Sequence, residues 1–119
     1  MIWHLDIQYM GKKEKSMIDI YLEYQAKYTE IYGSLAVVFM QVGSFYESYS
    51  TDTEGFNLKE LEKILHTKFT RRDNTTNKPP DRSNPNLLGF PCVSLNKNLS
   101  ILIENGYTIV VFDQVTDGE

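Results

Sequence analysis

The residues with the most distinctive chemistry in this chain are Gly43-Ser44-Phe45-Tyr46-Glu47, which closely follow the apolar run 35–40. If the chain is extended from Phe45 onward, side chains alternate between faces, so Phe45 and Glu47 share one face about 6.7 Å apart. An aromatic side chain at such a position is most often part of a core. That interpretation leaves Glu47 unexplained, because an unpaired buried carboxylate is costly.

The residue types that common enzyme sites require are missing from the sequence. Gly11-Lys12-Lys13 lacks the upstream glycine and the Ser or Thr of a phosphate-binding loop. One cysteine and two widely spaced histidines cannot fill a zinc site without many carboxylates. The chain also contains no Asp-x-Lys or Glu-x-Lys, the pattern common in nucleases on small α/β sheets. A Cys–His nucleophile pair stays open, although a lone cysteine is usually a small buried hydrophobe.

Length, charge and cysteine content narrow the class of protein. A chain of 119 residues with 41% hydrophobic and 24% charged residues fits one globular domain. A net charge of −4 argues against nucleic-acid binding by electrostatics alone. The single cysteine, Cys92, excludes an internal disulfide and indicates a reducing, intracellular compartment. No apolar run approaches the ~18 residues of a membrane span, and no signal peptide is visible, so we expect no membrane partner.

Positive charge gathers in the segment 67–86, where five basic residues face two acidic ones. The basic residues are Lys68, Arg71, Arg72, Lys78 and Arg82. A solvated loop is the ordinary interpretation of such a segment, and a contact with nucleic acid is the alternative.

Apolar periodicity and turn residues predict the order of the elements. In the first half, we expect a helix over 17–29 capped by Ser16 and Asp19, a strand over 35–42, a turn at 43–44 and an extended stretch over 45–49. A helix after Asn57 follows, then a short strand over 67–71, a loop over 73–86 and a strand over 87–93. The chain closes with a helix from Ser94, with Leu99, Leu102 and Ile103 inward, and a strand over 107–115.

This order predicts a single mixed α/β (α+β) domain over 16–119, with a mixed sheet of about five to six strands flanked by about three helices. Residues 1–15 are an uncertain lead-in. They fit a short strand over 3–9, a disordered lead-in or a remnant of expression.

Four short motifs, in this order, resemble the N-terminal mismatch-recognition domain of the MutS family of DNA mismatch-repair ATPases. The resemblance extends from Tyr21 to Gln114. The motifs are Gly43-Ser44-Phe45-Tyr46-Glu47, similar to the family's GDFYE with Ser44 in place of aspartate; Thr70-Arg71-Arg72, similar to LTKR; Gly89-Phe90-Pro91, similar to AGIP; and Gly106 to Gln114, similar to the closing strand. The amino-acid sequence at Met40–Ser44 and at Asp113–Thr116 most resembles the giant-virus and octocoral-mitochondrial branch of the family. The histidine that many relatives carry soon after the AGIP motif is missing.

The resemblance implies a function and a set of site residues. Phe45 would enter the DNA minor groove and stack on a mispaired base, and Glu47 would hydrogen-bond that base. Lys68, Arg71, Arg72, Lys78 and Arg82 would hold the DNA backbone. The partners would be mismatched double-stranded DNA and the remaining domains of a MutS chain, which would be dimeric. This fragment would be no enzyme and need no cofactor, whereas the parent protein would use ATP and Mg.

The resemblance also implies where the protein acts: in the cytoplasm of a virus-infected host cell, or in a mitochondrion. We expect the isolated chain to bind DNA weakly, since it is acidic and makes few phosphate contacts. Two rival interpretations stay open. One is a protein-interaction module of a DNA-repair complex without direct base contact. The other is a degenerate nuclease-like domain, which the missing acidic-x-Lys pattern disfavours.

Overall fold

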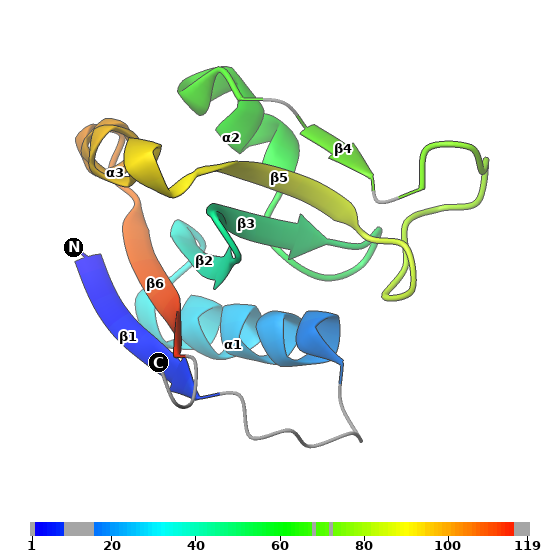
Figure 1. Cartoon of the computed structure of the whole chain (residues 1–119), viewed down its shortest axis with the longest axis horizontal. Helices are drawn as coiled ribbons and strands as arrows, with labels where there is room; N and C mark the ends of the chain where they lie inside the picture. The colour runs from blue at the N-terminus through cyan, green and yellow to red at the C-terminus, as the bar shows by residue number, and fades with distance from the viewer. Residues whose placement is uncertain (1, 9–15, 68, 72, 116–119) are drawn as a thin grey trace.

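The computed structural model describes residues 2–8, 16–67, 69–71 and 73–115. Within these residues, one six-stranded mixed sheet lies between helix α1 on one face and helices α2 and α3 on the other (Figure 1). The predicted mixed α/β fold is therefore confirmed. Family resemblance and apolar periodicity lead to the same architecture.

Helix α1 (Met17–Tyr32) begins where the sequence predicts and runs three residues further than the predicted 29. The hydroxyl of Ser16 accepts from the Asp19 N–H at 3.1 Å, and the Asp19 carboxylate accepts from the Ser16 N–H at 3.2 Å. These two bonds form a capping box, which satisfies two backbone donors that have no partner in the helix itself. Gly33 ends the helix with a φ of 100°, which favours glycine.

The sheet has the order β1-β6-β2-β3-β5-β4. Strands β1 (Ile2–Gln8), β6 (Thr108–Val115) and β2 (Ala36–Val42) run parallel, whereas β3 (Phe45–Ser50), β5 (Asn86–Pro91) and β4 (Phe69–Arg71) pair antiparallel. Of the interpretations open for residues 1–15, the structure has the strand, at residues 2–8 on the sheet edge. Residues 9–15 lie outside the described part.

Each face of the sheet carries its own core. Toward α1, the buried residues of the sheet are Val38, Met40, Tyr49, Val110 and Phe112. Toward α2 (Leu58–Leu65) and α3 (Leu95–Glu104), they are Val37, Phe39, Tyr46, Leu88, Phe90, Ile109 and Val111. Because both faces of β2 and β6 are covered, these strands are apolar without alternation, as is typical of central parallel strands.

Two sequence predictions need correction. Strand β5 ends at Pro91 rather than at Val93, and Cys92–Ser94 form a 3₁₀ turn, labelled η1, that leads into α3. Ile103 is 37% exposed rather than inward. The buried face of α3 consists of Asn98, Leu99 and Leu102, and Ile103 lies at its edge. Leu99 and Leu102 are buried as expected.

Candidate nucleic-acid interface

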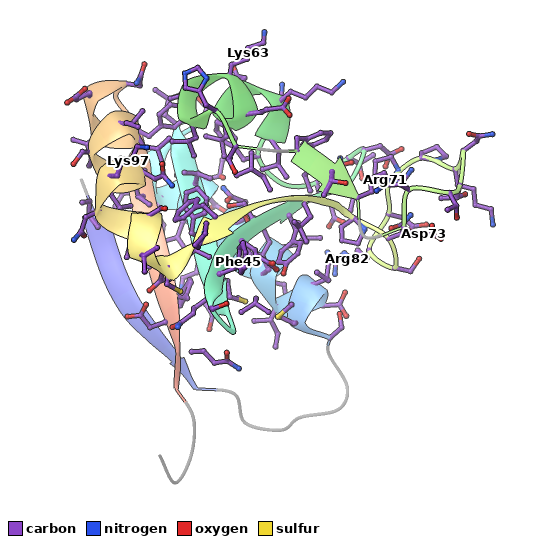
Figure 2. All side chains as sticks on the ribbon, turned by 45° about the horizontal axis from the view of Figure 1, so that its top comes forward. Phe45, Lys63, Arg71, Asp73, Arg82 and Lys97 are labelled. Atoms are coloured by element: carbon purple, nitrogen blue, oxygen red, sulfur yellow. The ribbon has the colours of Figure 1, made fainter. Side chains whose placement is uncertain are left out.

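A tight hairpin presents Phe45 at one end of the sheet. Gly43 and Ser44 connect β2 to β3, and Val42 pairs with Phe45 across the turn. Gly43 has a φ of 60° while Ser44 is not among the residues with positive φ, which is the pattern of a type II′ turn. The Phe45 side chain is 42% exposed, so the ring is available at the surface and not sealed in the core. Figure 2 labels Phe45 near this hairpin.

Glu47 lies on the same face of β3 as Phe45, two residues further along the strand. It is half-buried and pairs with Met40 on β2 and with Gly89 on β5. The hydroxyl of buried Tyr49 donates a hydrogen bond to the Glu47 carboxylate. The Glu47 carboxylate, which the sequence leaves unexplained, therefore has a hydrogen-bond donor that supports its position.

Hydrogen bonds from two other segments, and one within the hairpin, hold the hairpin tip. The Cys92 N–H donates to the Ser44 carbonyl at 2.8 Å, which fixes η1 against the turn. The Gln41 side chain donates to the Gly43 carbonyl at 3.3 Å and accepts from the Gln114 N–H at 3.0 Å. The tip is thus connected to β6 and to the end of β5, so Phe45 projects from a supported turn.

Tyr46 points to the opposite face and anchors the motif in the core. It is 6% exposed, and its hydroxyl donates to the Asp113 carboxylate of β6 at 2.7 Å. Burial, together with this nearby carboxylate, raises the pKa of Tyr46, so the phenol stays protonated and keeps donating. Tyr46 therefore helps to hold β3 in the register that buries Tyr46 and leaves Phe45 exposed on the opposite face.

The structure gives Arg71 contacts within the loop 73–86. Its guanidinium donates to the Lys78 carbonyl at 2.8 Å and to the Asn84 carbonyl at 3.3 Å. The Nε atom is buried and has no hydrogen-bond partner among the described residues. Arg71 thus ties the middle of the loop, at Lys78, to its end near Asn84. Its predicted contact with a DNA backbone stays a prediction.

Arg82 is likewise engaged with carboxylates of the same chain. It forms ion pairs with Glu54, in the turn before α2, and with Asp19, in the first turn of α1, the latter at 3.0 Å. The bond with the Arg82 guanidinium lowers the pKa of Glu54, and the Ser16 N–H together with Arg82 lowers the pKa of Asp19. Arg82 therefore has a structural role, and its predicted contact with a phosphate stays a prediction.

The two parts of the predicted site lie at opposite ends of β3. Phe45 pairs with Pro91 at one end of β5, whereas Ser50 pairs with Asn86 beside the loop 73–86 at the other. Five residue steps of a strand span about 17 Å. Figure 2 shows Arg71, Asp73 and Arg82 together around this loop. Lys78 is exposed there, and Lys68 and Arg72 lie outside the described residues.

Two residues near the hairpin were not singled out from the sequence. Val93 in η1 is 95% exposed, one residue after the Cys92 N–H that bonds to the turn. Tyr49 supports Glu47, and only its position two residues beyond Glu47 on one strand face could have indicated the contact.

Neither a metal centre nor a membrane span is found in the part of the chain that the structure describes. There, no three His, Cys, Asp or Glu side chains gather in a way that could hold a metal ion. No described helix has the length and apolar character to cross a membrane.

Comparisons with known proteins extend the motif-based resemblance over nearly the whole chain. The family model of MutS domain I matches residues 15–119. The chain belongs to the MutS domain I family. It is 47% identical over 108 residues to a putative DNA mismatch repair protein, a mutS homolog, of Acanthamoeba polyphaga mimivirus, covering 90% of the chain and 10% of that protein.

Bacterial relatives are more distant. The DNA mismatch repair protein MutS of Macrococcus caseolyticus is 31% identical over 105 residues, covering 88% of this chain and 10% of that protein. The MutS of Staphylococcus haemolyticus is 28% identical over 101 residues, covering 85% and 10%. This MutS domain I thus spans about a tenth of the length of the curated relatives it matches. The predicted family is confirmed.

Proposed function

We propose that this MutS domain I detects mispaired bases in double-stranded DNA by inserting Phe45 from the minor groove, with Glu47 hydrogen-bonding the displaced base. The observation that carries the proposal is the 42% exposure of Phe45 on a two-residue turn, with a carboxylate on the same strand face. An exposed apolar ring on a supported turn is a suitable wedge, because it needs no movement out of the core.

The energetics of wedge insertion favour damaged over intact DNA. An apolar wedge unstacks a base step and kinks the duplex by about 20–90°, at a cost of a few kcal/mol. A mispaired base is already partly unstacked, so the cost is smaller there. Stacking of the base on an aromatic ring returns about 1–3 kcal/mol. Discrimination then depends on how easily the site deforms, and Phe45 reads no base sequence.

The remaining affinity has to come from outside this chain. The chain carries a net charge of −4, and two of its candidate phosphate contacts, Arg71 and Arg82, are bonded internally. We therefore propose that the complete protein surrounds the duplex with further domains, as a dimer, and couples recognition to ATP and Mg. All five basic residues stay as proposed backbone contacts of this domain: Lys68, Arg71, Arg72, Lys78 and Arg82.

Truncation of the ring tests the proposal. In the complete protein, Phe45→Ala should reduce the ratio of affinities for a G·T duplex over the matched G·C duplex by about 5- to 100-fold, since stacking is lost. Ile31→Ala is the matched control, because Ile31 is another exposed apolar side chain, at 56%, on α1. Fluorescence anisotropy with both duplexes measures the ratio.

The outcomes separate the wedge from an interaction surface. Unchanged mismatch preference in Phe45→Ala would reject the wedge. Loss of binding to a repair protein without any effect on DNA would instead support a protein-interaction module. A loss of preference that Ile31→Ala shares would point to a general effect of surface truncation and also argue against the proposal.

A further inference from the structure

Tyr49 is a buried tyrosine whose hydroxyl is bonded to the proposed base-contacting residue. Its side chain is 1% exposed, and the hydroxyl donates to Oε1 of Glu47. A buried phenol needs a hydrogen-bond partner, and this partner is a carboxylate at the surface end of the same strand face. The contact joins the core under α1 to the side chain beside Phe45.

Packing against α1 fixes the Tyr49 ring. The ring of Tyr21 meets it edge to face, with centroids 5.2 Å apart and planes at 84°. Tyr21 is itself fully buried, and its hydroxyl donates to the Val38 carbonyl at 2.8 Å. Tyr49 therefore has a defined position from which its hydroxyl reaches toward residue 47.

The neighbouring strands confine Glu47 on both sides. Met40, its partner on β2, is 2% exposed. Gly89, its partner on β5, is so close that a Cβ atom there would lie 3.1 Å from the Glu47 Cγ. No hydrogen bond to Oε2 of Glu47 is found among the described residues, so one carboxylate oxygen is committed to Tyr49 and the other is available.

We infer that Tyr49 is a positioning residue for mismatch recognition: its hydroxyl fixes the Glu47 carboxylate so that one oxygen is presented to the base beside Phe45. This inference rests on the proposed function of Phe45 and Glu47. A free Glu side chain loses rotamer entropy when it is immobilised on a ligand, and preorganisation reduces this cost. The advantage applies only where Glu47 meets a base, so it raises preference for mismatched DNA.

A purely structural role is the alternative, in which Glu47 merely satisfies the buried Tyr49 hydroxyl. The two roles differ in what the Tyr49→Phe variant changes. A structural role lowers stability and leaves mismatch preference intact. A positioning role lowers mismatch preference, and only as long as Glu47 is present.

The test is a double-mutant cycle in the complete protein. Tyr49→Phe, Glu47→Ala and the double variant are compared for the ratio of G·T over G·C affinities and for thermal unfolding. Tyr21→Phe is the control, because it removes another buried hydroxyl from the same core and keeps its ring against Tyr49. We expect Tyr49→Phe to lower the ratio about 3- to 10-fold, and to change it less than about 2-fold when Glu47 is already Ala.

Each result decides one claim. A full loss of preference in Glu47→Ala with none in Tyr49→Phe would overturn the inference and leave the proposed function standing. An equal effect of Tyr49→Phe with and without Glu47, or an effect that Tyr21→Phe shares, would also overturn it. An unchanged ratio in Glu47→Ala would reject the proposed role of Glu47, and the role of Tyr49 with it.

Discussion

At the scale of single residues, Phe45 and Glu47 combine opposite requirements. The phenyl ring has to stay exposed to reach a base, whereas the carboxylate has to be ordered without being sealed from water. The exposure of Phe45 at the turn and the half-burial of Glu47 between β2 and β5 meet both requirements. The strand alternation that places the two side chains on one face thereby becomes a functional feature.

Gly89→Ala is expected to disturb Glu47 without touching Phe45. The added Cβ would lie 3.1 Å from the Glu47 Cγ and 3.1 Å from the Tyr46 carbonyl, so one of the two has to move. We predict a loss of about 1–3 kcal/mol in the free energy of unfolding and a several-fold loss of mismatch preference. Urea unfolding and anisotropy measure the two effects.

The Glu47→Ala background provides the control for this substitution. Removal of Cγ takes away one of the two close contacts, so the combined variant should recover part of the lost stability. A combined variant as unstable as the sum of both single variants would show that Gly89 does not confine Glu47.

At the scale of elements, a side chain of α1 acts as a partner for β2. Gln25 is 2% exposed; its amide nitrogen donates to the Ala36 carbonyl at 2.9 Å, and its oxygen accepts from the Val38 N–H at 2.8 Å. Strand β3 pairs with β2 only at residues 40–42, so Gln25 satisfies backbone groups that the sheet leaves open. Helix α1 is thereby bonded to the strand that leads to the hairpin.

Gln25→Ala should lower the stability of the chain while the exposed Glu30→Ala should not. The first substitution leaves a buried N–H and a buried carbonyl without partners, which costs about 1–3 kcal/mol for each unsatisfied group. A surface substitution on the same helix is expected to stay within about 0.5 kcal/mol. Urea unfolding of both variants checks this. A Gln25→Ala chain as stable as Glu30→Ala would contradict the role of Gln25.

Patterns local in sequence predict most of the elements. The capping residues Ser16 and Asn57, the apolar run of β2 and the glycine of the turn each specify their own conformation. The exposed position of Phe45 follows from strand alternation together with the family resemblance. What these features share is that the decisive neighbours lie within a few residues.

Contacts between distant segments are not visible in the sequence. From the sequence, the loop 73–86 looks solvated because nothing near Arg82 indicates Asp19, which lies 63 residues away. Gln25 reads as an ordinary polar helix residue because its partners belong to a strand that follows the helix. Val93 reads as a strand residue, since the 3₁₀ turn depends on the bond from Cys92 to Ser44.

At the scale of the whole molecule, one arginine connects three segments that are distant in sequence. The guanidinium of Arg82 joins the loop 73–86, the first turn of α1 and the turn before α2. The wedge and this loop occupy opposite ends of β3. A duplex that touches both would therefore extend along the strand direction, over about 17 Å.

Arg82→Gln should destabilise the chain at neutral pH and lose this effect in acid. The pKa values of Asp19 and Glu54 lie below their ordinary values of 3.8 and 4.5 in the folded chain. Their contribution to stability is present above those values and is lost as the pH falls through the lowered pKa values. We expect a decrease of a few degrees or less in the unfolding temperature at pH 7, which disappears once the pH has fallen below the lowered pKa values of both carboxyls.

Lys78→Gln is the control for the pH series, because it removes one positive charge from the same loop without breaking these ion pairs. Thermal unfolding from neutral to acidic pH should show little change for Lys78→Gln. If the Arg82→Gln difference persisted unchanged in acid, the ion pairs would not be its cause.

The central claim is that the Phe45 ring stacks on a mispaired base, and photochemical crosslinking tests it most directly. A duplex with 5-iodouracil opposite guanine at one position is bound by the complete protein, irradiated and digested, and the attached peptide is sequenced by mass spectrometry. The account predicts a crosslink at Phe45 that becomes much weaker when 5-iodouracil pairs with adenine. A crosslink at another residue, or equal yield at Phe45 from the matched pair, would contradict it.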